Sequence, residues 1–113
     1  MNAATRLSQL SPARQQLVCL CQALNYGIIR SLDVTAGEPV FNPPPVVVYD
    51  WKLDTEERPR PETTAADFEL RQEVHRMLAK LDQIGDGWVE NIEVRAGLPR
   101  RMAIEVALNG VQR

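Results

Sequence analysis

The sequence predicts an α+β fold in which two tandem αββ units form one antiparallel sheet with two helices packed on one face. Three observations lead to this prediction. Two segments carry apolar residues at helical spacing, each segment is followed by strand-like alternation, and the two halves of the chain resemble each other. At 113 residues the chain has the length of one domain, so residues 1–113 are treated as a single domain.

The first helix is predicted to begin at Ser11-Pro12, which provides a hydroxyl N-cap and a proline at the first helical position. Asn25-Tyr26-Gly27 is expected to end it, because glycine accepts the positive φ that helix ends often need. The apolar stripe of this helix is formed by Leu17, Leu20, Cys21 and Leu24.

A half-buried strand is predicted next, over residues 28–34, with Leu32 and Val34 on one face. The turn Ala36-Gly37-Glu38-Pro39 then leads into a short return strand that begins at Val40.

Three consecutive prolines, Pro43 to Pro45, interrupt this return strand. Because proline has no backbone donor, we expect polyproline-like chain at a sheet edge here. Residues 46–53 (VVVYDWKL) have strong β character and are predicted to form an additional strand. Residues 54–63 are charged, contain two prolines and no apolar residue, and are interpreted as a solvated connector.

The second helix is predicted to start at Thr64, with Asp67 three residues later in a pattern that resembles a capping box. Gly85-Asp86-Gly87 is expected to end it. Its apolar stripe is formed by Leu70, Val74, Met77, Leu78 and Leu81.

A second hairpin follows this helix. Trp88 to Arg95 is predicted to be a strand, Ala96-Gly97-Leu98-Pro99 a turn, and Arg100 to Leu108 the return strand. The residues expected to face the core are Trp88, Ile92 and Val94 on the first strand and Met102, Ile104, Val106 and Leu108 on the second.

The two halves of the chain align with each other. Residues 27–39 match residues 87–99 without a gap and share an Ala-Gly-x-Pro turn, and Arg14 to Leu24 matches Arg71 to Leu81. We interpret this similarity as an internal duplication, since packing two such units together would bury the apolar faces of both. The boundaries are about 11–53 for unit one, 54–63 for the connector and about 64–108 for unit two.

Arg30 and Glu90 are equivalent in this alignment and carry opposite charges on the predicted apolar faces of their strands. One hypothesis is that they pair near the pseudo-twofold axis between the units. The alternative is that both side chains extend to the edge of the sheet.

The order of helix, Tyr-Gly, strand, glycine-containing turn and return strand resembles a family of very short bacterial proteins of unknown function. The resemblance rests on Asn25-Tyr26-Gly27 and covers Leu17 to Val40, and also Val74 to Ile104, where Asp86 replaces the tyrosine. The proline-rich insert departs from the pattern. The resemblance implies a bacterial origin and the helix–hairpin unit, and it implies no activity.

Composition narrows the class of protein. With 13 basic and 15 acidic side chains the net charge is -2, which argues against a nucleic-acid partner because such binders usually carry a basic surplus. No apolar stretch reaches the roughly 18 residues of a membrane-spanning helix, and the N-terminus does not read as a signal peptide, so we expect no membrane partner and a cytoplasmic protein. Cys19 and Cys21 are spaced too awkwardly on a helix to bridge each other, so free thiols are expected.

No catalytic motif is recognisable in the sequence. The single histidine, His75, and the two cysteines lack the ligand spacing of a structural zinc site, so we expect no metal and no cofactor. We name no catalytic residue and favour a protein that is not an enzyme.

Three functional hypotheses follow. The leading one is a small non-catalytic module for protein interaction or self-association, with a protein partner or a homodimer. The alternative is a small-ligand-binding or enzymatic domain with a site near Tyr49 and Trp51, since these residue types are enriched at binding hot spots. The third is anion or nucleic-acid binding through the hairpin that carries Arg95, Arg100 and Arg101, a cluster that is otherwise a solvated hairpin tip.

Overall fold

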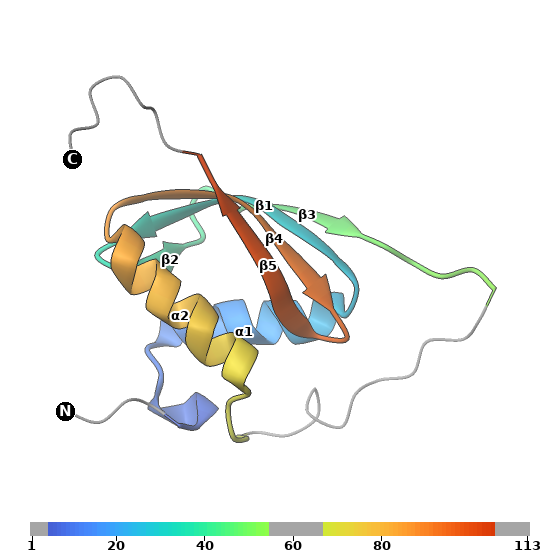
Figure 1. Ribbon diagram of the computed structural model, residues 1–113, viewed down its shortest axis with the longest axis horizontal. Coiled ribbons are helices and arrows are strands. Elements are labelled where there is room, and N and C mark those ends of the chain that lie inside the picture. Colours follow the sequence, from blue (N-terminus) through green and yellow to red (C-terminus); the bar gives the residue numbers. More distant parts are fainter. Residues whose placement is uncertain (1–4, 55–66, 106–113) are drawn as a thin grey trace.

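The computed structural model describes residues 5–54 and 67–105. The predicted α+β class is confirmed, with an antiparallel five-stranded sheet and two helices that lie on the same side of it (Figure 1). The elements are a short 3-10 turn (Leu7–Gln9), α1 (Pro12–Leu24), β1 (Gly27–Thr35), β2 (Glu38–Val40), β3 (Val46–Tyr49), α2 (Gln72–Ile84), β4 (Gly87–Arg95) and β5 (Leu98–Ile104).

The strands β1 and β4 form the centre of the sheet. They pair antiparallel from Gly27↔Val94 to Val34↔Gly87. β5 pairs with the outer side of β4, whereas β2 and β3 pair in succession with the outer side of β1. The sheet therefore has one edge made of a single strand, β5, and one edge made of two short strands.

α1 forms as the sequence predicts. The Ser11 hydroxyl accepts a hydrogen bond from the Arg14 amide (3.2 Å), and the helix ends at Leu24 with Asn25 in a positive-φ conformation. The buried side chains of the helix are Leu17, Val18, Cys21 and Leu24, with Leu20 partly buried beside them.

α2 begins later than predicted. Thr64 lies outside the described residues, but residues 67–71 are not helical, and the helix starts at Gln72 with Arg71 as its N-cap. The predicted capping role of Asp67 is therefore wrong. Its carboxylate instead accepts hydrogen bonds from Ser8, a contact between residues far apart in the chain.

The core lies between the helices and the sheet. From the sheet it is built by Ile29, Leu32 and Val34 of β1 and by Val89, Ile92 and Val94 of β4. From the helices it takes Leu17, Val18, Cys21, Leu24, Val74, Met77, Leu78 and Leu81. These side chains form one contact cluster, so both halves of the chain contribute to the same core.

The inward-facing positions of the two central strands change phase at mid-strand. In β1 the positive φ of Ser31 marks the change, and in β4 a register shift against β5 falls between Val89 and Asn91. Val89 is consequently buried, whereas Trp88 is 38% exposed. The prediction that Trp88 shares the buried face with Ile92 and Val94 is wrong for this reason.

The same phase change moves Arg30 and Glu90. Both are exposed rather than on the core face, and no ion pair joins them in the described part of the chain. They do lie near the middle of the β1–β4 pairing, where Arg30 is opposite Asn91. The hypothesis that they pair is thus wrong, although their place near the centre of the sheet is as expected.

The triple proline lies at a sheet edge, as predicted. Residues 41–45 connect β2 to β3. Asp33 pairs with Val40 and Arg30 pairs with Val46, so these five residues span only Ser31 and Leu32 of β1. The additional strand predicted over residues 46–53 is confirmed for Val46–Tyr49, where Val47 packs against the core, but residues 50–53 are not part of a strand. Residues 55–63 of the predicted connector lie outside the described residues.

Corresponding elements of the two halves are separated by 60 positions, both for the first residues of the helices and for those of β1 and β4. The sequence alignment, which matches Arg14 with Arg71, places the two helices three residues out of this register. In the structure, buried Leu17 and Val18 correspond to buried Met77 and Leu78. Each hairpin turn also contacts the end of the other half's helix. The Gly37 amide donates to the Gly85 carbonyl (2.8 Å), and the Gly97 amide donates to the Asn25 carbonyl (2.9 Å).

The stability of the β1–β3 pairing can be tested at Gly27. A Cβ at this position would overlap the Val48 carbonyl oxygen, whereas a Cβ on Gly87, the corresponding residue of β4, would lie 3.3 Å from the Cγ2 of Ile84. We expect Gly27→Ala to lower the free energy of unfolding by about 1–3 kcal/mol, as overpacking does. Gly87→Ala is the matched control and should cost less. Urea unfolding followed by tryptophan fluorescence measures both, and equal losses would contradict the close approach of β3.

Candidate functional site

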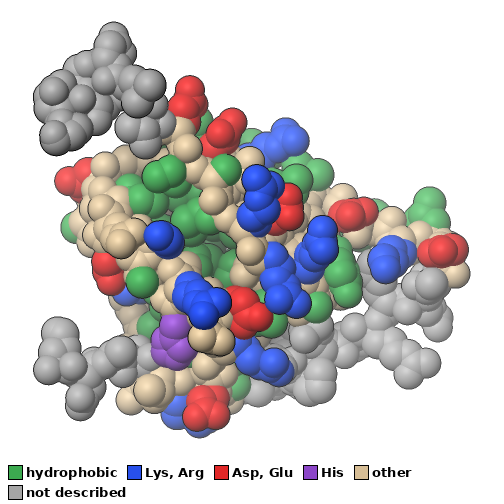
Figure 2. Space-filling view, in the orientation of Figure 1, with side chains coloured by type: hydrophobic (Ala, Val, Ile, Leu, Met, Phe, Trp, Pro, Cys, Tyr) green, Lys and Arg blue, Asp and Glu red, His purple; other side chains and the backbone are tan. Residues whose placement is uncertain are grey.

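A groove lies between α2 and the edge strand β5. Its volume is about 740 Å³. Figure 2 shows hydrophobic surface in this hollow, with Lys and Arg side chains on either side of it. It is lined by Glu73, Arg76, Met77, Lys80, Gln83, Ile84, Asp86, Gly87 and Trp88 on one side and by Pro99 to Met102, Ile104 and Glu105 on the other.

The helical wall of the groove follows from the amphipathic pattern of α2. Val74, Leu78 and Leu81 are buried in the core. Arg76 and Lys80, one turn apart, are exposed and line the groove. The α2 side of the groove therefore presents Arg76 and Lys80, with Glu73 one turn before them, beside apolar side chains.

The floor exposes large apolar side chains. Ile104 is 48% exposed, while Met102 packs partly against the core. Trp88 also lines the groove and is 38% exposed, although it does not share the helix-facing side that Val89 occupies. The predicted inward position of Ile104 is only partly correct, because Ile104 pairs with buried Val89 and so faces the helix-covered side of the sheet, but its side chain is 48% exposed. Val106 and Leu108, predicted on the same face, lie outside the described residues. The sequence pattern identified these residues as apolar, but it did not show that nothing in the described chain covers them.

The three predicted arginines are separated by the fold. Arg100 forms an ion pair with Glu73 of α2 (3.2 Å), and Arg101 pairs with Glu93 of β4 (3.3 Å). Both line the groove, whereas Arg95 is exposed at the end of β4 and does not. Arg100 and Arg101 each have a carboxylate partner, which weakens the case for a compact anion site at this hairpin.

The cations of the α2 wall have no such partners. In the described part of the chain, no ion pair involves Arg76, and the Lys80 ammonium contacts only the Gln83 side-chain oxygen (3.3 Å). Their positive charge is thus available to an acidic group that enters the groove.

Tyr49 and Trp51 lie at the opposite edge of the sheet. Their rings are 5.6 Å apart and tilted by 50°, and the residues are 50% and 68% exposed. Neither lines the groove, nor the smaller hollow of about 210 Å³ near Val18 and Phe68. The structure therefore brings Tyr49 and Trp51 together but separates them from the three arginines.

The cysteines are free, with Cys19 exposed and Cys21 buried. Burial raises the pKa of the Cys21 thiol to about 12, so this thiol stays protonated and unreactive. In residues 5–54 and 67–105, no three side chains of His, Cys, Asp or Glu are grouped as metal ligands.

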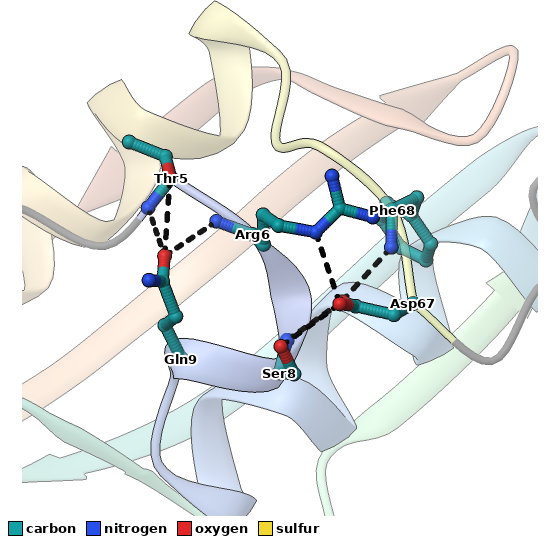
Figure 3. Close-up of polar contacts among 6 residues, drawn as sticks. All are labelled: Thr5, Arg6, Ser8, Gln9, Asp67 and Phe68. Atoms are coloured by element: carbon teal, nitrogen blue, oxygen red, sulfur yellow. Dashed lines mark hydrogen bonds and ion pairs between the residues drawn. The ribbon is translucent and has the colours of Figure 1, made fainter.

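A cluster of polar contacts joins the N-terminal segment to the segment before α2 (Figure 3). The Asp67 carboxylate accepts hydrogen bonds from the Arg6 guanidinium (3.0 Å) and from the amide and hydroxyl of Ser8 (both 2.9 Å). The backbones also pair, since the Leu7 amide donates to the Phe68 carbonyl and the Leu70 amide to the Thr5 carbonyl. We call residues 5–9 and 67–70 the N-terminal clasp and interpret it as structural.

The clasp changes the titration of Asp67. The hydrogen bond from Arg6, and then that from the Ser8 amide, lower the pKa of this carboxyl from 3.8 to about 2. A charged Asp67 is therefore favoured in the folded protein.

Comparison of the chain with models of known protein families, with curated proteins and with solved structures finds no match. Neither helix of the described chain is long and apolar enough to cross a membrane. The groove is accordingly interpreted from its own geometry and chemistry.

The clasp predicts a pH-dependent loss of stability. Because the folded pKa of Asp67 is depressed, its contribution is complete above the unfolded value of about 4 and is lost as the pH falls towards 2. Asp67→Asn should lower the urea midpoint near neutral pH, and the difference from the wild type should shrink below about pH 4. Asp33→Asn, on a strand outside the clasp, is the control. A difference that persists unchanged at pH 2 would contradict the role of the Asp67 charge.

Proposed function

We propose that the chain is a non-catalytic interaction module that binds a partner protein through the groove between α2 and β5. The observation that carries this proposal is the combination of exposed apolar side chains, Trp88 and Ile104, with the cations of the α2 wall and an edge strand. Contiguous exposed apolar surface with a polar rim is typical of protein contact sites.

The residue types of the groove support contact with a macromolecule. Tryptophan, methionine and arginine are enriched in protein interfaces, and all three line the groove. Methionine at position 102 adapts its shape to different partner side chains. The groove is also bounded by regular elements, α2 and β5.

The proposal is tested by photo-crosslinking in the native host. A benzoylphenylalanine residue is placed at position 104 in one variant and at position 46 in the other. Val46 is the control, because it is a 54% exposed aliphatic residue on the opposite sheet edge. We expect a protein adduct from position 104 and none from position 46.

Two outcomes would overturn the proposed function. One is the absence of a position-104 adduct, or adducts of equal yield from both positions. The other is a native mass spectrum of gently purified protein in which a small molecule is bound and is displaced by substitution of Tyr49 or Trp51. That result would favour the alternative site at the β3 edge.

We also infer that the fold arose by duplication of an αββ unit. Three observations support this inference. The helices have 13 residues each and β1 and β4 have nine each, all at a separation of 60 positions. The β1–β4 pairing is symmetric under exchange of the units, because Ile28↔Glu93 corresponds to Asp33↔Trp88. The turn-to-helix hydrogen bonds of Gly37 and Gly97 are likewise reciprocal.

A protein made of two copies of residues 67–105, joined by the natural connector, tests the duplication. If the units are equivalent, the two copies of β4 should pair in the register of β1 with β4. Nuclear Overhauser contacts between Trp88 of one copy and Glu93 of the other report this register. An unfolded chain, or a different register, would count against equivalence of the units.

A further inference from the structure

We propose that the partner enters the groove as an extended, acidic segment that pairs with the free edge of β5 as an additional strand. This inference rests on the proposed function and specifies the chemistry of the partner. It is an example of β-strand addition, in which backbone hydrogen bonds supply affinity and alternate side chains supply specificity.

The first support is the unpaired edge of β5. In the described residues β5 pairs with β4 alone, so its other side presents backbone donors and acceptors without strand partners. Pro99 has no N–H to donate and lies at the start of the strand. The usable edge is therefore Arg100–Ile104, long enough for a short extended peptide.

The second support is the position of the apolar floor beside this edge. Met102 and Ile104 pair with Ile92 and Val89, whose buried side chains define the helix-facing side of the sheet. A strand added beside β5 would project alternate side chains to that same side. Those side chains would lie between β5 and α2, over Ile104.

The third support comes from the first half of the chain, where the corresponding region is covered. There Leu20 of α1, Phe41 after β2 and Val47 of β3 all pack against the core. The positions 60 residues after Leu20 and Phe41 hold Lys80 and Arg101, which are exposed. The position 60 residues after Val47 lies outside the described residues. Among the described residues, the first half thus covers this region with apolar side chains, whereas the second half has Lys80 and Arg101 at the equivalent positions.

The charge of the groove favours an acidic segment over a second copy of the chain as its occupant. Arg76 and Lys80 stand on the α2 side of the groove and have no ion-pair partner among the described residues, whereas Arg100 and Arg101 of β5 are paired with Glu73 and Glu93. Glu73, Asp86 and Glu105 also line the groove, so the positive charge is concentrated at Arg76 and Lys80. A second copy that paired through its own β5 would bring the same cations into this space, and like charges would repel. An extended segment with apolar residues and carboxylates complements both the floor and its rim.

The experiment uses the full chain and synthetic peptides. A pool in which glutamate alternates with valine, isoleucine, leucine or phenylalanine is passed over the immobilised protein, with a second pool that has lysine in place of glutamate. We expect retention of the glutamate pool only. Fluorescence anisotropy then gives the affinity of the best-retained peptide, and backbone amide shifts of Arg101 to Ile104 map its position.

N-methylation of the peptide tests the strand pairing. N-methyl groups on one alternate set of residues should abolish binding, and those on the other set should leave it nearly unchanged, because only one set faces β5. Equal effects of the two sets would overturn strand addition.

Variants of the protein test the floor and the charge. Ile104→Asp should weaken binding by about tenfold or more, while Val46→Asp, at a similarly exposed strand residue on the other edge, should not. Lys80→Glu should weaken binding and flatten its salt dependence, whereas Lys52→Glu is the charge-matched control.

The outcomes separate this inference from the proposed function. If position 104 crosslinks to a protein but no peptide of the pool binds, or lysine peptides bind equally well, strand addition by an acidic segment is wrong and the interaction role stands. If sedimentation shows a dimer that Ile104→Asp dissociates, the occupant is a second copy and the inference is again overturned. Loss of the position-104 crosslink itself removes the proposed function.

Discussion

The antiparallel pairing of β1 with β4 is the interaction on which the rest of the structure depends. It joins segments about 60 residues apart and brings Ile29, Leu32, Val89 and Ile92 together as the centre of the core. Neither hairpin could bury this face alone, since a two-stranded hairpin is marginally stable in water. The register of the pairing is fixed from both ends. The Gly37 amide binds the end of α2 and the Gly97 amide binds the end of α1, so a slip of the central strands would break both contacts.

The two edges of the sheet differ: two short strands form one edge and a single continuous strand forms the other. This difference follows from the proline insert. On the β1 side the return strand is divided into β2 and β3, and Pro43 to Pro45 between them supply no backbone donors. Short strands and prolines discourage pairing with another chain. On the β4 side β5 is continuous from Leu98 to Ile104 and has only one proline, at its start. Within the described residues the outer edge of β5 is unpaired and lies beside the groove, a feature that folding alone does not require.

Most of the fold could be predicted from local sequence. The errors occurred where contacts between residues far apart in the chain determine the start of a helix or the exposure of a side chain. The start of α1 at Ser11-Pro12 and the positions of both hairpins follow from capping, alternation and turn residues. The start of α2 did not, because Asp67 is used by Arg6 and Ser8, which lie about 60 residues earlier. The exposure of Trp88 depends on a register shift between β4 and β5, which no residue type specifies. Of the candidate site, Arg100 and Arg101 were identified as a basic cluster, but their separate carboxylate partners and the groove appear only in three dimensions.

The energetics of the groove favour an interpretation in terms of binding. If the exposed part of Ile104 or of Trp88 were covered, each side chain would contribute a burial free energy on the order of 1 kcal/mol, at about 25 cal/mol per Å² of apolar area. The first half of the same chain obtains such cover from Leu20, Phe41 and Val47. In the second half a leucine at position 80 would extend the apolar surface of α2 towards Ile104, yet the chain carries lysine there. Among the described residues, the region that is closed in the first half is therefore open in the second half and bordered by Arg76 and Lys80. An exposed apolar surface that costs stability, beside a strand edge that has no partner among the described residues, is what is expected of a surface that a partner covers.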